Sequence, residues 1–219
     1  MRKVLVIAVH PDDETLGCGG TLLKHKADGD EIHWLICTNL SKTSSYYEIR
    51  QQEIKQVKSL YRFNSTEQLD FETMKVDEYS MSELITSISH IVNKIQPTDI
   101  YLPFSGDVHS DHRKIFEASY SCTKLFRYPF IQNIYMMETL SETEFAPSIV
   151  SDNFTPNYFV NISDFLDTKL DIMQIYKSEI APHPFPRSLQ NIQALATLRG
   201  ATAGCLYAES FMLLKAIRS

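Results

Sequence analysis

The chain has 219 residues, of which 43% are hydrophobic and 22% charged, so it can bury a sizeable core and does not have the composition of a disordered chain. Its formal net charge of −6 argues against a nucleic-acid backbone as the main partner, because phosphate binding needs clustered Lys and Arg. The four cysteines are scattered without a C-x-x-C pair, which argues against a cysteine-based zinc site.

Strands and helices are expected to alternate through the first 124 residues. Residues 3–8 form a short apolar run rich in β-branched side chains, which is typical of a buried parallel strand. Ser80 and Glu83 form a capping box, and the helix that it opens stops before Pro97. The expected strands are residues 3–8, 31–37, 68–71 and 99–103. A turn is expected over residues 17–20, and the expected helices are residues 21–27, 47–61, 80–95 and 111–124.

The C-terminal third has a less regular pattern. Strands are expected at residues 133–137 and 158–161, helices at 163–178 and 188–200, and a strand or a helical end at 210–214. Because strands alternate with helices, we expect right-handed βαβ units and a parallel sheet. The fold class is therefore α/β: a single domain over residues 1–219, with a Rossmann-like, mainly parallel sheet flanked by helices and an active site at the C-terminal ends of the strands.

The cellular location is expected to be the cytoplasm. The longest apolar stretches, such as residues 4–9, are far too short to span a bilayer. The chain also opens directly into a strand-like run, which leaves no room for a signal peptide. We therefore expect no membrane partner.

Two segments concentrate side chains of the types that bind metal ions. They are His10-Pro11-Asp12-Asp13-Glu14 and His109-Ser110-Asp111-His112, and each follows an expected parallel strand. Ligands of open α/β sheets bind at this strand edge. A catalytic zinc takes three protein ligands from His, Asp and Glu and leaves one position for water. A nearby carboxylate can then act as a base, and a further histidine can stabilise an oxyanion.

Each segment alone also has an ordinary structural explanation. The first could be an acidic turn whose aspartate caps a helix, and the second could be two surface histidines with a capping aspartate. If the site had no function, both ordinary explanations would have to be true at the same edge of the sheet. The paired segments therefore favour a metal site.

The first segment, with Ala8 and Val9 before it, resembles the A-(x)-H-P-D-D-E signature of the PIG-L/LmbE-like zinc deacetylases. The second, followed by Arg113, resembles the H-x-D-H-R signature of that family. Further similarities run through nearly the whole chain: Gly17-Cys18-Gly19-Gly20, Leu22, Arg50, Glu53, Arg199-Gly200 and Tyr207-Ala208-Glu209-Ser210-Phe211.

The resemblance implies a role for each matching residue. His10, Asp13 and His112 would bind one Zn²⁺, although iron, cobalt or manganese would also suit two histidines and one aspartate. Asp12 would be the general base, and His109 would stabilise the oxyanion or protonate the leaving amine.

The remaining matches imply supporting roles. Asp111 would orient a histidine, and Glu14 would support the site without binding the metal. Arg50 is either an exposed salt-bridged arginine or a contact to a sugar hydroxyl or phosphate. The residues 182–187 form a surface turn or a lid.

The expected function is hydrolysis of the N-acetyl group of an amino sugar of the N-acetylglucosamine type, in a glycoside, sugar conjugate or nucleotide sugar. Acetate and a free amine would be released, and the partner is a small-molecule substrate. Two alternatives remain: another metal-dependent amide or ester hydrolase, and a non-catalytic sugar- or nucleotide-binding module, which predicts no metal. Homo-oligomer formation is left open.

Overall fold

The computed structural model describes residues 1–147 and 153–218 as one mixed seven-stranded sheet flanked by helices. The strands are β1 (Lys3–Ala8), β2 (Glu31–Asn39), β3 (Ser65–Glu72), β4 (Asp99–Leu102), β5 (Asn133–Met137), β6 (Tyr158–Asn161) and β7 (Ala208–Ala216). The helices are α1 (Asp13–Ala27), α2 (Tyr47–Tyr61), η1 (Val76–Glu78), α3 (Met81–Ile95), α4 (Ser110–Ser121), α5 (Leu166–Met173) and α6 (Leu189–Ala203). The predicted fold class is confirmed.

The strand order across the sheet is β3-β2-β1-β4-β5-β7-β6. The first five strands in this order are parallel, whereas β7 runs antiparallel to both β5 and β6. The chain order reverses between β1 and β4, which creates a crevice at their carboxyl ends. The segments that follow β1 and β4 therefore meet at the same place.

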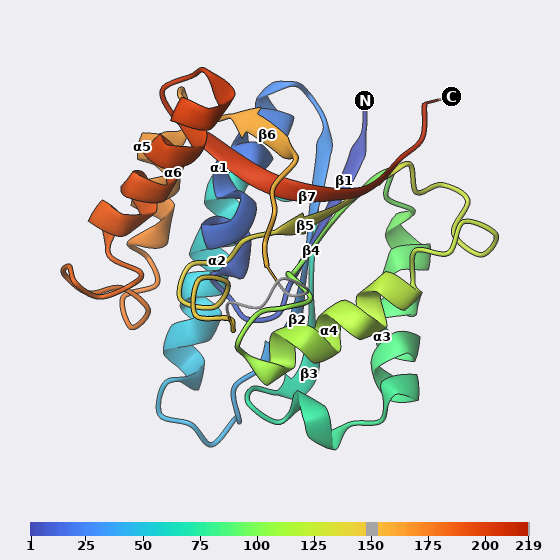
Figure 1. Cartoon of the computed structure of the whole chain (residues 1–219). Helices are drawn as coiled ribbons and strands as arrows, with labels where there is room; N and C mark the ends of the chain where they lie inside the picture. The colour runs from blue at the N-terminus through green and yellow to red at the C-terminus, as the bar shows by residue number, and fades with distance from the viewer. Residues whose placement is uncertain (148–152, 219) are drawn as a thin grey trace.

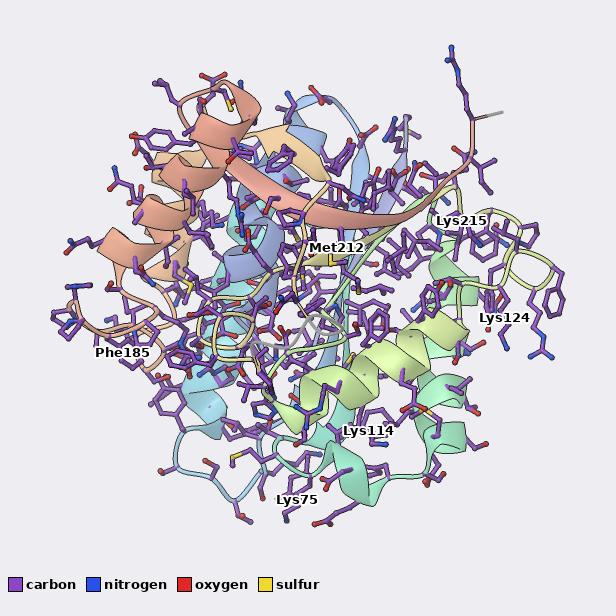
Figure 2. The ribbon with its side chains drawn as sticks, in the orientation of Figure 1. Lys75, Lys114, Lys124, Phe185, Met212 and Lys215 are labelled. Atoms are coloured by element: carbon purple, nitrogen blue, oxygen red, sulfur yellow. The ribbon has the colours of Figure 1, made fainter. Side chains whose placement is uncertain are left out.

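Two hydrophobic cores lie on opposite faces of the sheet because successive strand side chains point in opposite directions. Val4, Val6 and Ala8 of β1 pack toward α1, α2, α5 and α6, whereas Leu5 and Ile7 pack toward α3 and α4. Figure 1 shows these two groups of helices on either side of the sheet. In Figure 2, the labelled side chains of Lys75 and Lys124 lie at the edge of the molecule in this view.

The turn expected over residues 17–20 is wrong, because these residues belong to α1. The helix begins at Asp13 and is kinked at Cys18, where φ is −146°. Two buried charges stabilise the kink: Glu209 accepts hydrogen bonds from the amides of Gly20 and Thr21, and Lys169 donates to the carbonyl of Leu16. At Gly20 a Cβ atom would lie 2.8 Å from the side chain of Ile162, so the close approach of a neighbour, not a turn, requires glycine.

The C-terminal third also differs from expectation. The helix expected over residues 163–178 is only α5, and Ser163 bonds to Asn161 instead of capping it. The segment left open as a strand or helical end is β7, which pairs with β5 and β6. In the described parts of the chain, no helix is long and apolar enough to cross a membrane.

Candidate metal centre and pocket

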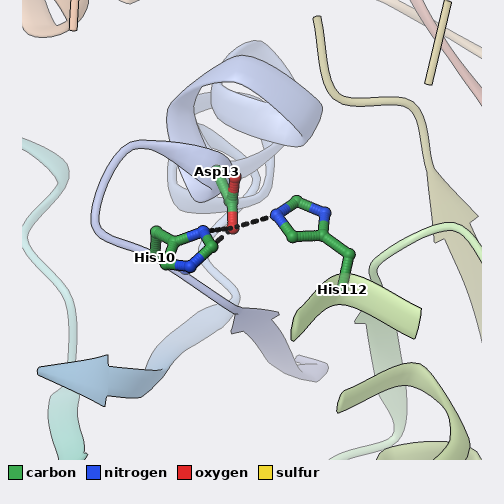
Figure 3. A group of neighbouring side chains, drawn as sticks. All are labelled: His10, Asp13 and His112. Atoms are coloured by element: carbon green, nitrogen blue, oxygen red, sulfur yellow. Dashed lines mark hydrogen bonds and ion pairs between the residues drawn. The ribbon is translucent and has the colours of Figure 1, made fainter. Parts of the chain in front are cut away.

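Three side chains from the two predicted segments come together at the crevice between β1 and β4. One ligand atom each from His10, Asp13 and His112 lies within 4.8 Å of the others. Figure 3 shows the two imidazole rings on either side of the Asp13 carboxylate. His112 Nε2 lies 3.4 Å from Asp13 Oδ2, and His10 Nδ1 lies 3.9 Å from the same oxygen. This group could hold a metal ion.

The ring of His112 has one nitrogen bound and the other free. Nδ1 lies 2.8 Å from Asp107 Oδ2, whereas the buried Nε2 has no hydrogen-bond partner within residues 1–147 and 153–218. Burial lowers the pKa of His112, but the charges of Asp13 and Asp107 outweigh it and raise the pKa to about 9. The surroundings of this nitrogen therefore favour a bound cation, whether a proton or a metal ion.

The ring of His10 is oriented by a contact at Nε2, the nitrogen that does not face Asp13. Its Nε2 lies 3.3 Å from Asp111 Oδ2, which leaves Nδ1 toward Asp13. Asp111 also accepts hydrogen bonds from the amides of Met74 and Val76, so its position is fixed by the segment after β3. Each histidine of the cluster thus has a carboxylate behind it, an arrangement that fixes ring orientation in metal sites.

The two adjacent aspartates differ in their hydrogen bonds. Asp13 Oδ2 accepts the backbone amides of Val9 and His10, at 2.9 and 2.8 Å. The Asp12 carboxylate accepts no hydrogen bond from the described part of the chain. The backbone of Asp12 has φ 133°, a strained conformation for a residue with a side chain. Asp13 is therefore held toward the cluster, while Asp12 is left open to the pocket that it lines.

Burial raises the pKa of the Asp12 carboxyl well above its usual value, and the neighbouring Asp13 charge raises it further. Burial likewise raises the pKa of Glu14 to about 7. The Glu14 carboxylate accepts hydrogen bonds from the Asp12 amide, Thr15 and Tyr176, so it holds the strained segment and does not reach the cluster.

His109 caps α4 and faces the pocket. Its Nδ1 accepts the amide hydrogen of Asp111 at 3.1 Å, and its ring centroid lies 4.8 Å from that of His10. Burial lowers its pKa to about 4, and the charges of His10 and His112 act in the same direction. A neutral ring whose Nδ1 accepts a hydrogen bond carries its proton on Nε2. That nitrogen can donate a hydrogen bond.

His10, His109 and Asp111 form a second group of side chains that could hold a metal ion. Its carboxylate is already engaged, because Asp111 accepts two backbone amides and lies 3.3 Å from His10 Nε2. The cluster of His10, Asp13 and His112 is therefore the better candidate.

The cluster opens into a pocket of about 350 Å³. Arg50 lies in its wall and is buried, so it is not the exposed arginine of the alternative explanation. Its guanidinium donates to the carbonyl of Pro11 at 2.9 Å and pairs with Glu53 and Glu179.

Sequence reasoning missed several residues of the site. They are Asp107, Thr143, Glu142 and Glu179, and Arg187 was noted only as part of the turn or lid at residues 182–187. Asp107 could have been recognised as a carboxylate in the same loop as a candidate ligand. Glu142, Glu179 and Arg187 lie in irregular segments, where no periodicity or motif marks them.

Comparison with known proteins relates this geometry to a family. The model of the PIG-L family, described as GlcNAc-PI de-N-acetylase, matches residues 5–123. A diacetylchitobiose deacetylase of Thermococcus kodakarensis is 25% identical over 232 residues, which cover 99% of this chain and 85% of the relative. A probable N-acetyl-α-D-glucosaminyl L-malate deacetylase 2 of Bacillus anthracis is 22% identical over 82% of each chain.

Solved structures support the fold. The N,N′-diacetylchitobiose deacetylase from Pyrococcus horikoshii, complexed with its inhibitor MPG, superimposes with a TM-score of 0.78 at 21% identity, over 98% of this chain and 84% of that one. This likeness concerns the fold alone, whereas the family model covers more than half of the chain and both candidate metal-binding segments. The chain belongs to the PIG-L family of de-N-acetylases, and it is a hydrolytic enzyme.

Proposed function

We propose that the chain removes the acetyl group from an N-acetylated amino sugar of the N-acetylglucosamine type, with a Zn²⁺ ion held by His10, Asp13 and His112. One observation carries the proposal: the free Nε2 of His112 faces Asp13, beside Asp12, whose carboxylate accepts no hydrogen bond from the residues that the structure describes. A metal ligand and a free base side by side are what amide hydrolysis requires.

The donor set fits a catalytic zinc. Two histidine nitrogens and one carboxylate oxygen are typical zinc ligands, and three protein ligands leave a position for water. The same donors would accept iron, cobalt or manganese. When bound, the ion would supply a Lewis acid that polarises the acetyl carbonyl and makes water easier to deprotonate.

The side chains of the chain itself then have separate tasks. Asp12 would accept the proton of the attacking water, since its carboxylate is unengaged and a cation bound nearby would lower its raised pKa. His109 donates its Nε2 hydrogen to the oxygen on which negative charge develops, so its effect is exerted mainly in the transition state. Asp107 and Asp111 hold the two histidines, and Glu14 holds the segment of Asp12.

The pocket wall provides the contacts to the sugar. Arg50 and Asn39 line it, as does Leu40 from the segment after β2. We propose Arg50 as a substrate contact. The two relatives are named for substrates of different charge: diacetylchitobiose is neutral, and the malate conjugate is anionic. The residues of its own pocket therefore decide whether this chain accepts a neutral or an anionic substrate.

A substrate screen tests the proposal. The protein is incubated with N-acetylglucosamine, N,N′-diacetylchitobiose and UDP-N-acetylglucosamine, and released acetate is measured. We expect acetate from at least one of these sugars and none from the Asp12→Asn variant above about 1% of the wild-type rate. Release of phosphate or of an ester alcohol, without acetate from any N-acetyl sugar, would favour the alternative of another hydrolase.

A further inference from the structure

A single carboxylate binds both arginines of the pocket. Glu179 Oε1 pairs with Arg50, and Glu179 Oε2 accepts a hydrogen bond from Arg187 at 3.1 Å. Arg187 Nε also donates to the backbone carbonyl of Glu179 at 2.9 Å. Burial raises the pKa of Glu179, but Ser178 and the two arginines outweigh it and lower the pKa. Glu179 is therefore ionised at neutral pH and offsets part of the positive charge of the pocket.

Arg50 has little capacity left for an anion. Its other contacts are with the carbonyl of Pro11, with Ser178 and with Glu53. With Glu179 these contacts engage four of its five N–H groups, which leaves one hydrogen for a substrate hydroxyl. Its side chain is 8% exposed, so an anionic ligand would have to displace a carboxylate already in place. Arg187 is more exposed, and its guanidinium also donates to Ser141. Hydrogens of Arg187 that these bonds do not use can donate to a neutral hydroxyl.

The lining of the pocket contains more carboxyl groups than guanidinium groups. Its described lining contains four carboxylates and two guanidinium groups: Asp12, Asp13, Glu142 and Glu179 against Arg50 and Arg187. The residues 148–152, which lie outside the described range, contain no Lys or Arg.

Carboxylates distinguish hydroxyl groups from anions. A sugar hydroxyl can donate to a carboxylate, whereas a phosphate or carboxylate on the ligand can only accept and is repelled by it. We propose that Glu179 is a specificity-determining residue, which pairs with both Arg50 and Arg187 and offsets part of their charge, so that the pocket selects uncharged N-acetylated sugars over those carrying phosphate or carboxylate groups. The inference rests on the proposed deacetylase function and names its substrate class.

The experiment compares substrates that differ by one phosphate. Acetate release is measured for N-acetylglucosamine and for its 1-phosphate and 6-phosphate, with the zinc-loaded protein. We expect kcat/KM to be at least about tenfold higher for the neutral sugar than for either phosphate. Glu179→Gln keeps the shape of the side chain and removes its charge. It should reduce the preference at least about tenfold, chiefly by raising kcat/KM for the phosphates.

Glu144→Gln is the control, since Glu144 is an exposed glutamate outside the lining of this pocket. It should keep the preference of the wild type. A wild-type protein that prefers the phosphates, or a Glu179→Gln variant that keeps the neutral preference, would overturn the inference while leaving the deacetylase function intact.

Calorimetry provides a readout that needs no turnover. The same three sugars are titrated into the zinc-loaded wild type, and tighter binding of the neutral sugar supports the inference. Tighter binding of the phosphates would overturn it. If no sugar releases acetate, the proposed function fails, and the binding order still tests the charge selectivity. This arm uses the wild-type protein, so it does not depend on the folding of a variant.

Discussion

The two ring nitrogens of His112 face two different aspartates: Nδ1 lies 2.8 Å from Asp107, and Nε2 lies 3.4 Å from Asp13. Only Nδ1 is within hydrogen-bond distance of its carboxylate, so when the ring gives up one proton to bind a metal ion, Nδ1 keeps its hydrogen and the lone pair is on Nε2. Thr143 donates to the other oxygen of Asp107 at 2.6 Å, which fixes the carboxylate in turn. The orientation of His112 is therefore set before any metal ion binds.

Asp107→Asn should weaken zinc binding by about 10- to 100-fold, because the amide can present its NH₂ group to Nδ1 and no longer fixes the tautomer. Competition with a chromogenic chelator measures the dissociation constant. Asp167→Asn, an exposed position on α5, provides the control and should bind zinc like the wild type. Unchanged affinity in Asp107→Asn would show that Asp107 does not support the metal site.

Asp12→Asn should keep the metal and lose about 10²- to 10⁴-fold in kcat, since general-base catalysis contributes about that much. Asp13→Asn should lose metal affinity, because Asp13 is the aspartate whose Oδ2 faces both histidines. Elemental analysis and acetate-release rates on both variants make the comparison. Zinc lost from Asp12→Asn and retained in Asp13→Asn would mean that the two roles are reversed.

His109→Ala should bind zinc normally, with a nearly unchanged KM and a kcat reduced by about 10²- to 10³-fold, the usual effect of losing one oxyanion donor. The variant removes a ring that caps α4, so its melting temperature is measured alongside. His109→Gln restores a side-chain donor and should recover part of kcat. Loss of zinc from His109→Ala with retention in His112→Ala would contradict the assignment.

Arg50→Lys should raise KM for the sugar more than it lowers kcat, because one point charge cannot reproduce the contacts of the guanidinium. Arg50→Ala is the poorer test. It leaves Glu53 and Glu179 without their partner and should destabilise the fold by about 3 to 5 kcal/mol, the usual effect of breaking a buried ion pair. Steady-state kinetics and thermal melts separate the two effects. An unchanged KM in a stable Arg50→Lys variant would exclude Arg50 as a substrate contact.

The sequence predicted the parallel part of the fold well, because buried parallel strands are continuous apolar runs such as residues 3–8. It also predicted that His10, Asp13 and His112 come together, since strand ends of a parallel sheet share one edge. The turn expected over residues 17–20 was wrong because the groups that stabilise the kink, Lys169 and Glu209, lie 140 residues or more away in sequence.

The substrate-facing side of the pocket could not be predicted. Glu179 and Arg187 lie between α5 and α6 in a segment without regular structure, and only tertiary contacts bring them to Arg50. Asp107 could have been predicted, because it lies only five residues before His112 and a carboxylate so close to a histidine can support it. Local patterns thus identified the candidate metal ligands, while their supports and the pocket wall depend on contacts between distant segments.

The dependence of acetate release on the metal tests the central claim most directly. Acetate from N,N′-diacetylchitobiose or N-acetylglucosamine is measured for the protein as purified, after chelation, and after addition of one equivalent of Zn²⁺, in parallel for the wild type and His112→Ala. We predict that chelation abolishes release, that Zn²⁺ restores it in the wild type, and that His112→Ala stays inactive. Acetate release that persists in a verified zinc-free protein, or that survives in His112→Ala, would contradict the account.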